Sequence, residues 1–433
     1  MVVPALRRLP LERAILIAVP VTILGIACSS SWSTGLQSVG RPVRAAGFAA
    51  LVVLALAYAR TRPGRLDGAP LATAGAFIAV AVASAAWSVE PRHTLASAAA
   101  FGALLVVASA LARGADDEAR RRLLWAVVAG AVLVGLAGVL VAVASPHHAV
   151  QAATGSVGRR YRGIGVNPNT DAMLFAISLP LSAFLWLDSR ERARIAAAAS
   201  FALCAGSIVA AGSRGAATAA VIGLLALAVA HRRAPLPRAV TAGAAIALAL
   251  TAIFVTAVSA PLTPAQAARA RTAVGNTEPY TPNDAEYILR QSDEIGSESS
   301  ASSRSIFDTS GRLQAWQGAI DQAVDRPALG YGFGTETGVF VDRYRAFEGG
   351  VPENSFIGVF LQLGGVGLAI LIALVVALVS AARRRGGPAA TVGLAVLATG
   401  LVLAVVQSYV YAVGNVATLG FWLCAFLPAG GRE

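Results

Sequence analysis

The sequence predicts an all-α polytopic membrane protein, with about 12 transmembrane helices and a large outer-face loop that carries an amphipathic helix. Three observations predict this class. Hydrophobic residues make up 56% of the 433 residues and charged residues only 13%, a balance too apolar for a water-soluble fold of this length. Apolar runs of about 20 residues, the length that crosses a hydrocarbon core of roughly 30 Å, recur along the chain. Arg residues gather in alternate short loops between these runs.

The apolar runs divide the chain into three parts. Residues 1–259 contain nine predicted spans: 14–28, 43–59, 71–87, 94–112, 123–144, 170–187, 195–211, 215–230 and 238–259. The first span follows Arg7, Arg8 and Arg13, as a signal peptide would, but further spans follow it, so we expect an uncleaved helix. Residues 260–353 form the outer-face loop. Residues 354–433 contain three more spans, 354–380, 389–407 and 410–428, with a tight turn near 408–411.

The positive charge indicates orientation in the membrane. The chain contains no Lys, and its 35 basic residues give a net charge of +12. Arg clusters such as "RTRPGR", "RGADDEARRR" and "ARRRGG" fall in alternate loops, and positively charged loops favour the cytoplasmic side. We therefore expect both termini in the cytoplasm, insertion in the cytoplasmic (inner) membrane, and no nucleic-acid partner. Cys28, Cys204 and Cys424 show no metal-ligand spacing and are expected to pack.

The outer-face loop holds thirteen acidic residues and eight Arg. Its "DEIGSESSASSRS" stretch is Ser-rich and predicts a flexible segment. After Ser310, a plausible N-cap, an amphipathic helix is predicted over 311–325, with Leu313, Trp316, Ile320 and Val324 on its apolar face. Such a helix should lie on the membrane surface or cap a cavity there. Arg312, at the border of the apolar stripe, can face a lipid head group.

The Gly-rich run "PALGYGFGTETG" follows this helix. It resembles a phosphate-binding fingerprint, but no strand precedes it. A turn that brings the backbone close to a polar ligand or to a neighbouring helix fits better.

Four outer-face motifs contain Arg against the usual charge bias: "GRRYRGIGVNPN", "AGSRG", "SGRLQAW" and "DRPALGYGFG". Arg214 lies in a turn between two apolar runs, where its guanidinium suits phosphate or carboxylate oxygens, although a snorkelling Arg satisfied by water is the alternative. Asn167 and Asn169 flank Pro168 at the start of the sixth span, where backbone N–H groups suit an anionic ligand. An Asn-Pro turn with solvated Arg is the alternative there.

The order of "YRGIGVNPN", "SRG", "SGRLQAWQGAI", "RPALGYGFG" and "ENSFIGVFLQLGGVG" resembles the O-antigen ligase and Wzy polymerase family over roughly residues 150–380. The resemblance implies a fold similar to multi-spanning glycosyltransferases that use lipid-linked donors. It implies transfer of a glycan from a polyprenyl-diphosphate carrier to a hydroxyl of a lipid or another glycan in the outer leaflet, without a cofactor. By motif, Arg162, Arg214 and Arg312 are the pyrophosphate candidates. Further candidates for substrate binding are Asn167, Asn169, Trp316, Arg326 and Asn354.

One departure concerns Glu353. Ligases of this family typically carry His just before the residue that matches Asn354 or Ser355, and this chain has Glu353 instead. Glu353 is the candidate catalytic base if partial burial raises its pKa, or else transferase activity is altered or lost. A third interpretation is that Glu353 caps the tenth helix. A non-enzymatic carrier or flippase of lipid-linked saccharide is the rival class, but the spans offer little polar path for it.

Overall fold

The computed structural model describes residues 8–62, 64–151, 160–230, 312–340 and 351–431, together with Ala245 and Leu248. In this part of the chain, nine helices are long and apolar enough to cross a membrane. They are α2 (Arg8–Ser29), α3 (Thr34–Thr61), α4 (Gly68–Ala83, with its 3-10 extension), α5 (Pro91–Gly114), α6 (Asp117–Ala144), α8 (Pro168–Asp188), α9 (Glu191–Ala211), α16 (Ser355–Arg385) and α17 (Gly387–Val406). Two apolar helices are shorter, α10 (Arg214–Ala230) and α18 (Val416–Phe426). The predicted span 238–259 falls almost entirely outside the described residues.

The remaining elements are short. The helical ones are η1 (Ser84–Ala86), α7 (Pro146–Ala149), α14 (Arg312–Ala323), α15 (Glu336–Val339) and η2 (Leu427–Ala429). Two antiparallel strand pairs join β1 (Arg65–Leu66) to β4 (Gly430–Gly431) and β2 (Val150–Gln151) to β3 (Arg160–Tyr161).

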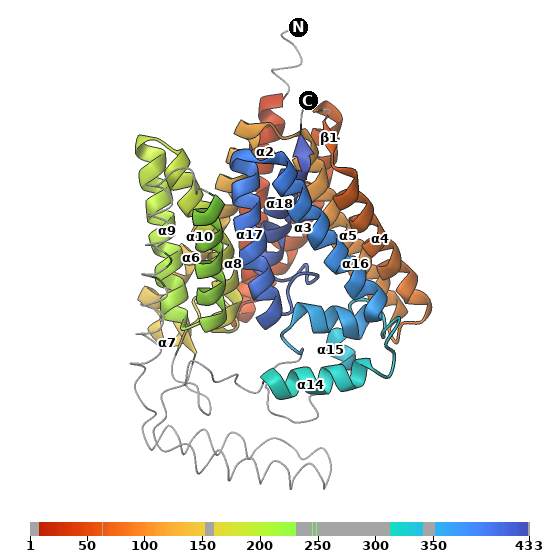
Figure 1. Cartoon of the computed structure of the whole chain (residues 1–433). Helices are drawn as coiled ribbons and strands as arrows, with labels where there is room; N and C mark the ends of the chain where they lie inside the picture. The colour runs from red at the N-terminus through yellow and green to blue at the C-terminus, as the bar shows by residue number, and fades with distance from the viewer. Residues whose placement is uncertain are drawn as a thin grey trace.

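The start of α2 and the short strand β4 lie on one side of the helix bundle (Figure 1). We call this side the terminal end and the opposite side, which carries α7, α14 and α15, the loop end. Three contacts gather the Arg-rich loops at the terminal end: Arg113 donates to the carbonyl of Gly64, Arg121 pairs with Asp188, and Arg384 pairs with Asp67. The segregation of Arg clusters on one side is therefore a property of the fold. The side of the membrane that each end faces stays a prediction.

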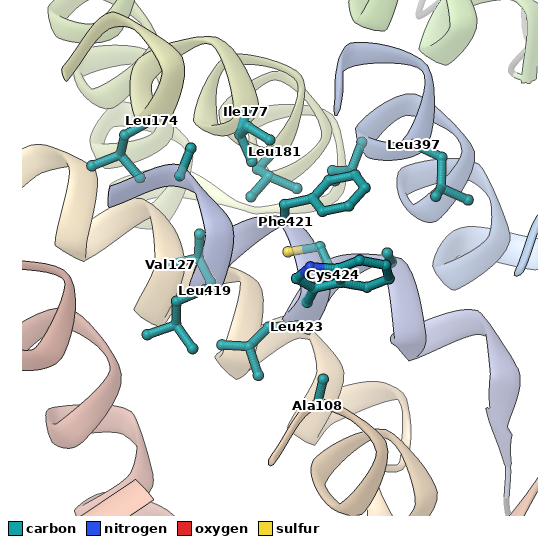
Figure 2. Close-up of a cluster of buried hydrophobic side chains, with 14 of the residues drawn as sticks. Ala108, Val127, Leu174, Ile177, Leu181, Leu397, Leu419, Phe421, Leu423 and Cys424 are labelled. Carbon is teal, nitrogen blue, oxygen red and sulfur yellow. The ribbon is translucent and has the colours of Figure 1, made fainter. Parts of the chain in front are cut away.

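The core of the bundle is built around α18 (Figure 2). Every residue of this helix is buried. Its side chains pack against residues of α5, α6, α8 and α17: Ala108, Val127, Leu174, Ile177, Leu181 and Leu397. A helix surrounded by protein needs no polar face, which explains why its sequence is apolar on all sides. Cys424 and Cys204 are buried in helices, as a packing role requires.

An irregular segment, residues 407–415, precedes α18 where the sequence predicts a tight turn and an early helix start. Tyr409 and Val410 are buried here, and their backbone N–H groups donate to the Ser355 hydroxyl at 3.0 and 3.3 Å. The carbonyl of Val410 accepts from the Trp422 indole at 2.7 Å. Non-helical backbone among membrane helices requires such partners, because lipid offers none. The predicted start at residue 410 is therefore wrong by about one and a half turns.

α16 is kinked at Gly364, whose backbone is left-handed with φ 61° and ψ −164°. The prediction of one continuous span over 354–380 misses this break. The Gly-rich run fills the kink: Gly365 N–H donates to the carbonyl of Pro327 at 2.8 Å, and Gly332 N–H donates to the carbonyl of Gln362 at 2.8 Å. A Cβ at Gly330 would lie 2.4 Å from the Gln362 carbonyl carbon, so only glycine fits there. Of the two interpretations of this run, the close approach to a neighbouring helix is confirmed.

α14 packs on the first part of α16 through its small residues. Ala315, Ala319 and Ala323 are fully buried and contact Leu361 and α15. The bulky apolar side chains point elsewhere, since 55% of Leu313 and 59% of Val324 is exposed. Leu313 and Val324 of the predicted apolar stripe therefore face away from the protein, as expected for a helix that lies on a membrane surface, whereas Trp316 of the same stripe is partly buried.

Candidate functional site

Arg312 and Glu353 meet at the loop end although 41 residues separate them. The Nε and one terminal nitrogen of Arg312 donate to Glu353 Oε2 at 3.0 and 2.5 Å. Both side chains are mostly buried, with 21% and 16% exposed. Next to this pair, the Trp316 indole donates to the carbonyl of Pro352 at 2.8 Å. Three predicted site residues are thus brought together where α14 meets the start of α16.

Glu353 does not cap α16. The cap is Asn354, whose side-chain oxygen accepts from the N–H groups of Phe356 and Ile357 at 3.0 and 3.1 Å. The capping interpretation of Glu353 is therefore wrong, and Asn354 has a structural role. Glu353 itself has a left-handed backbone with φ 47°, a conformation that costs a side-chain-bearing residue about 1–2 kcal/mol. This conformation turns its carboxylate toward Arg312 instead of the helix start.

Segment 407–415 supports the same carboxylate from the other side. Gln407 Nε2 donates to Glu353 Oε2 at 3.3 Å. The Ser355 hydroxyl donates to the carbonyl of Gln407 at 2.7 Å, and Asn354 N–H donates to the Ser408 hydroxyl at 3.2 Å. The carboxylate oxygen of Glu353 thus receives donors from two separate elements.

Glu336, which is not among the predicted site residues, is the second carboxylate of this region. Only 5% of it is exposed, and its two oxygens accept hydrogen bonds from Ser408 at 2.8 Å and Tyr411 at 2.5 Å. Burial raises the pKa of Glu336 to about 7, although these two hydrogen bonds oppose the shift. Its one distinguishing signal in the sequence is that it stands inside the Gly-rich run, which is otherwise free of charge.

A second cluster of predicted residues forms around the start of α8. Asn167 caps the helix by accepting from the N–H groups of Asn169 and Thr170 at 2.9 and 3.1 Å. The side-chain oxygen of Asn169 accepts from Arg160 at 2.8 Å and from the Ser213 hydroxyl at 2.9 Å. Because both Asn oxygens are occupied within the protein, the Asn-Pro motif has a structural role. Arg160 also donates to the carbonyl of Ala211 at 2.8 Å, which ties this cluster to the end of α9.

Arg162 lies beside this cluster in an aromatic stack. Its Nε donates to the carbonyl of His148 at 3.0 Å, and its guanidinium carbon lies 5.3 Å from the centre of the Trp32 ring. Trp32 in turn stacks on the His148 ring at 4.7 Å. The guanidinium is therefore held in one orientation at the loop end.

Arg214 and Arg326 complete the predicted set. Arg214 is the first residue of α10, directly after Ser213, and is partly buried beside the Asn169 cluster. Arg326 lies on another part of the loop end, where its guanidinium covers the Tyr331 ring at 4.7 Å. Arg44 is a further loop-end cation that the sequence analysis placed inside a span. It donates to the Ser29 hydroxyl at 3.2 Å, and its guanidinium lies beside Gly414.

Segment 407–415 contacts the elements of both clusters. Gln407 touches Glu353, whereas the side-chain amide of Asn415 donates to the sulfur of Met173, on α8, at 3.8 Å. Within the described residues, no group of three or more His, Cys, Asp or Glu side chains is arranged to hold a metal ion. The site that these contacts define combines cationic guanidinium groups with two carboxylates.

These features define a class: a multi-pass membrane protein whose loop end presents Arg side chains and carboxylates held by hydrogen bonds. The model of the O-antigen ligase family matches residues 199–372. This segment contains Arg214, Arg312, Glu336 and Glu353, and it ends inside α16. The resemblance to the O-antigen ligase and Wzy polymerase family is thereby confirmed over this segment. No curated protein sequence matches the chain.

Proposed function

We propose that the protein transfers a glycan from a polyprenyl-diphosphate carrier to an acceptor hydroxyl, and that the loop end lies at the outer face of the cytoplasmic membrane. The observation that carries this proposal is the Arg312–Glu353 pair, which joins a cation and a carboxylate inside the segment matched by the O-antigen ligase family. Glycan transfer from a diphosphate needs both groups, a cation for the leaving group and a base for the acceptor.

In this mechanism Arg312 changes partners. Without substrate, Glu353 compensates its charge. The diphosphate of the donor offers a more highly charged partner, and the guanidinium turns to the phosphate oxygens. Glu353 is then left with the Gln407 amide and accepts the proton of the acceptor hydroxyl. The acceptor oxygen bonds to the anomeric carbon, the bond from that carbon to the phosphate oxygen breaks, and polyprenyl diphosphate leaves with the electron pair.

Arg214 and Arg162 are the proposed further contacts of the diphosphate. Both lie at the loop end, and Arg162 is oriented by Trp32 and His148. Fixed donors of this kind stabilise the charge that develops on a leaving phosphate more than flexible ones do, because they need little reorganisation. Asn167, Asn169 and Asn354, whose side-chain oxygens accept hydrogen bonds within the protein, are proposed to support the site.

Substitution of Glu353 tests this function. Glu353→Gln keeps the size but cannot accept a proton, so transfer from a purified polyprenyl-diphosphate glycan should fall by about 10²–10⁴. Glu353→His restores the residue typical of the family and should keep activity, with a pH dependence that follows an imidazole near roughly 6.5. Asp325→Asn, at an exposed carboxylate that follows α14, is the control and should transfer like the parent.

Two results of this experiment would decide against the proposal. If Glu353→Gln turns over like the parent, the base is not Glu353. If labelled donor changes leaflet in vesicles without an acceptor, and no glycan is transferred when an acceptor is added, the protein is a carrier.

A further inference from the structure

Glu336 is a buried carboxylate that the mechanism above does not use. It opens α15 and points both oxygens at segment 407–415, where Ser408 and Tyr411 donate to them. Buried carboxylates are costly unless their oxygens are satisfied, and here both are. Burying a carboxylate nevertheless costs more free energy than burying a neutral group that could accept from the same two hydroxyl groups. We therefore expect Glu336 to have a role beyond packing.

The fold leaves space for this cluster. A Cβ at Gly358 would lie 1.9 Å from the Tyr411 hydroxyl and 2.6 Å from Glu336 Oε1. The first part of α16 can therefore approach the cluster only because residue 358 is glycine. Phe333 covers the Tyr411 ring edge-on, with ring centres 6.2 Å apart.

Two short paths connect Glu336 to Glu353. Ser408, which donates to Glu336, accepts from the N–H of Asn354, the residue after Glu353. Its neighbour Gln407 donates directly to the Glu353 carboxylate. The position of segment 407–411 therefore determines where the Glu353 oxygens lie, and Glu336 holds this segment at residues 408 and 411.

We propose that Glu336 is a positioning residue of the transfer site, whose carboxylate fixes segment 407–411 against α16 and thereby orients Glu353. The proposal rests on the proposed function. An ionised carboxylate only accepts hydrogen bonds, so it sets the direction of both hydroxyl groups and leaves the Ser408 oxygen to accept from Asn354. An amide in its place would present a donor and lose this control.

The charge of Glu336 costs stability. Because its pKa is raised from 4.5 to about 7, the folded protein favours the neutral carboxyl. Its contribution to stability is complete below pH 4.5 and is lost as pH rises through about 7. Other titratable side chains that face this loop are Tyr411, Glu90 beside Gly338, His93, which contacts the carbonyl of Gly334, and the Arg312–Glu353 pair. A variant without the charge should therefore be at least as stable as the parent above pH 7.

The test compares Glu336→Gln with the parent in reconstituted vesicles. We expect kcat to fall about tenfold or more while KM for the lipid-linked donor changes less than twofold. In the parent, the rate should fall as pH drops through about 7, and Glu336→Gln should lose this pH dependence. Thermal unfolding in detergent at pH 8 should show the variant equal to or above the parent. If Glu336 only stabilised the fold, Glu336→Gln would lower the unfolding temperature together with the activity.

A partner variant and a control sharpen the result. Tyr411→Phe removes a hydrogen bond that lowers the pKa of Glu336, so the fall in rate should move to higher pH. Glu90→Gln, at an exposed carboxylate of the loop end, should keep the parent profile. An active parent with a Glu336→Gln variant that matches it at every pH overturns this proposal alone. A parent that transfers no glycan overturns the proposed function and this proposal with it.

Discussion

The proposed role of Arg312 at the loop end depends on the geometry of its guanidinium group. Arg312 directs two nitrogens at one oxygen of Glu353, an arrangement that a point charge on a flexible stem reproduces poorly. The same planar group is suited to phosphate oxygens. A Lys at this position should therefore replace Arg312 poorly, both in the pair with Glu353 and in the proposed contact with the diphosphate.

This reasoning gives a prediction for Arg312. Arg312→Ala should lower transfer by about 10²–10³, since one lost donor to a developing anion costs about 2.7–4 kcal/mol. Arg312→Lys should recover only a small part. Arg41→Ala is the control, because Arg41 is exposed at the same end and donates to Gln37, one turn earlier on α3. Initial rates at saturating donor measure the effect, and full activity of Arg312→Ala would remove Arg312 from the site.

The sequence predicted part of this site. Motifs in one loop identify Arg312, Trp316 and Glu353 as candidate site residues, but they do not predict the contacts that join these residues. The sequence leaves open whether Glu353 caps α16, and the structure decides against it because Asn354 accepts from the N–H groups of Phe356 and Ile357. Glu336 was missed because its significance comes from Ser408 and Tyr411, more than 70 residues away.

At the scale of elements, the kink of α16 depends on one glycine. A Cβ at Gly364 would lie 2.2 Å from the carbonyl carbon of Ala328, and φ 61° disfavours any other residue. Gly365, next to it, has its nearest neighbour 3.5 Å from such a Cβ and a negative φ. Position 365 should therefore tolerate a side chain, whereas position 364 should not.

We expect Gly364→Ala to lower the unfolding temperature in detergent and to reduce transfer, because the Gly-rich run can no longer enter the kink. The destabilisation should exceed about 2 kcal/mol, as backbone clashes do. Gly365→Ala should be neutral or slightly stabilising, since alanine is favoured over glycine in a helix by roughly 1 kcal/mol. Equal behaviour of the two variants would show that the kink is not needed.

Hydropathy located the apolar helices but not their interruptions. Apolar runs reveal which residues avoid water, and the helices of the described part follow them. The kink at Gly364 lies within an apolar run and leaves no mark in such a pattern, and the irregular segment 407–415 is marked only in part, as the tight turn predicted near 408–411. The kink is fixed by the Gly-rich run and the irregular segment by Ser355, partners elsewhere in the chain.

At the scale of the whole molecule, the segregation of Arg clusters predicts orientation. The terminal end should face the cytoplasm and the loop end the opposite side. A membrane-impermeant maleimide should label Gln317→Cys on α14 in intact cells and Arg192→Cys on α9 only after the membrane is opened. Both positions are exposed, so access alone decides the outcome. Labelling in the reverse order would contradict the outer-face mechanism.

The kink of α16 also sets how the protein matches the thickness of its membrane. As a straight helix, the 31 residues of α16 would be about 46 Å long, well beyond a hydrocarbon core of roughly 30 Å. The break at Gly364 leaves residues 365–385, about 32 Å of helix, to match that core. Residues 355–363 are released from the span and lie with α14 and α15 (Figure 1). A single glycine thereby converts an oversized helix into one of matched length and returns the surplus to the loop end, where Asn354 and Ser355 are needed.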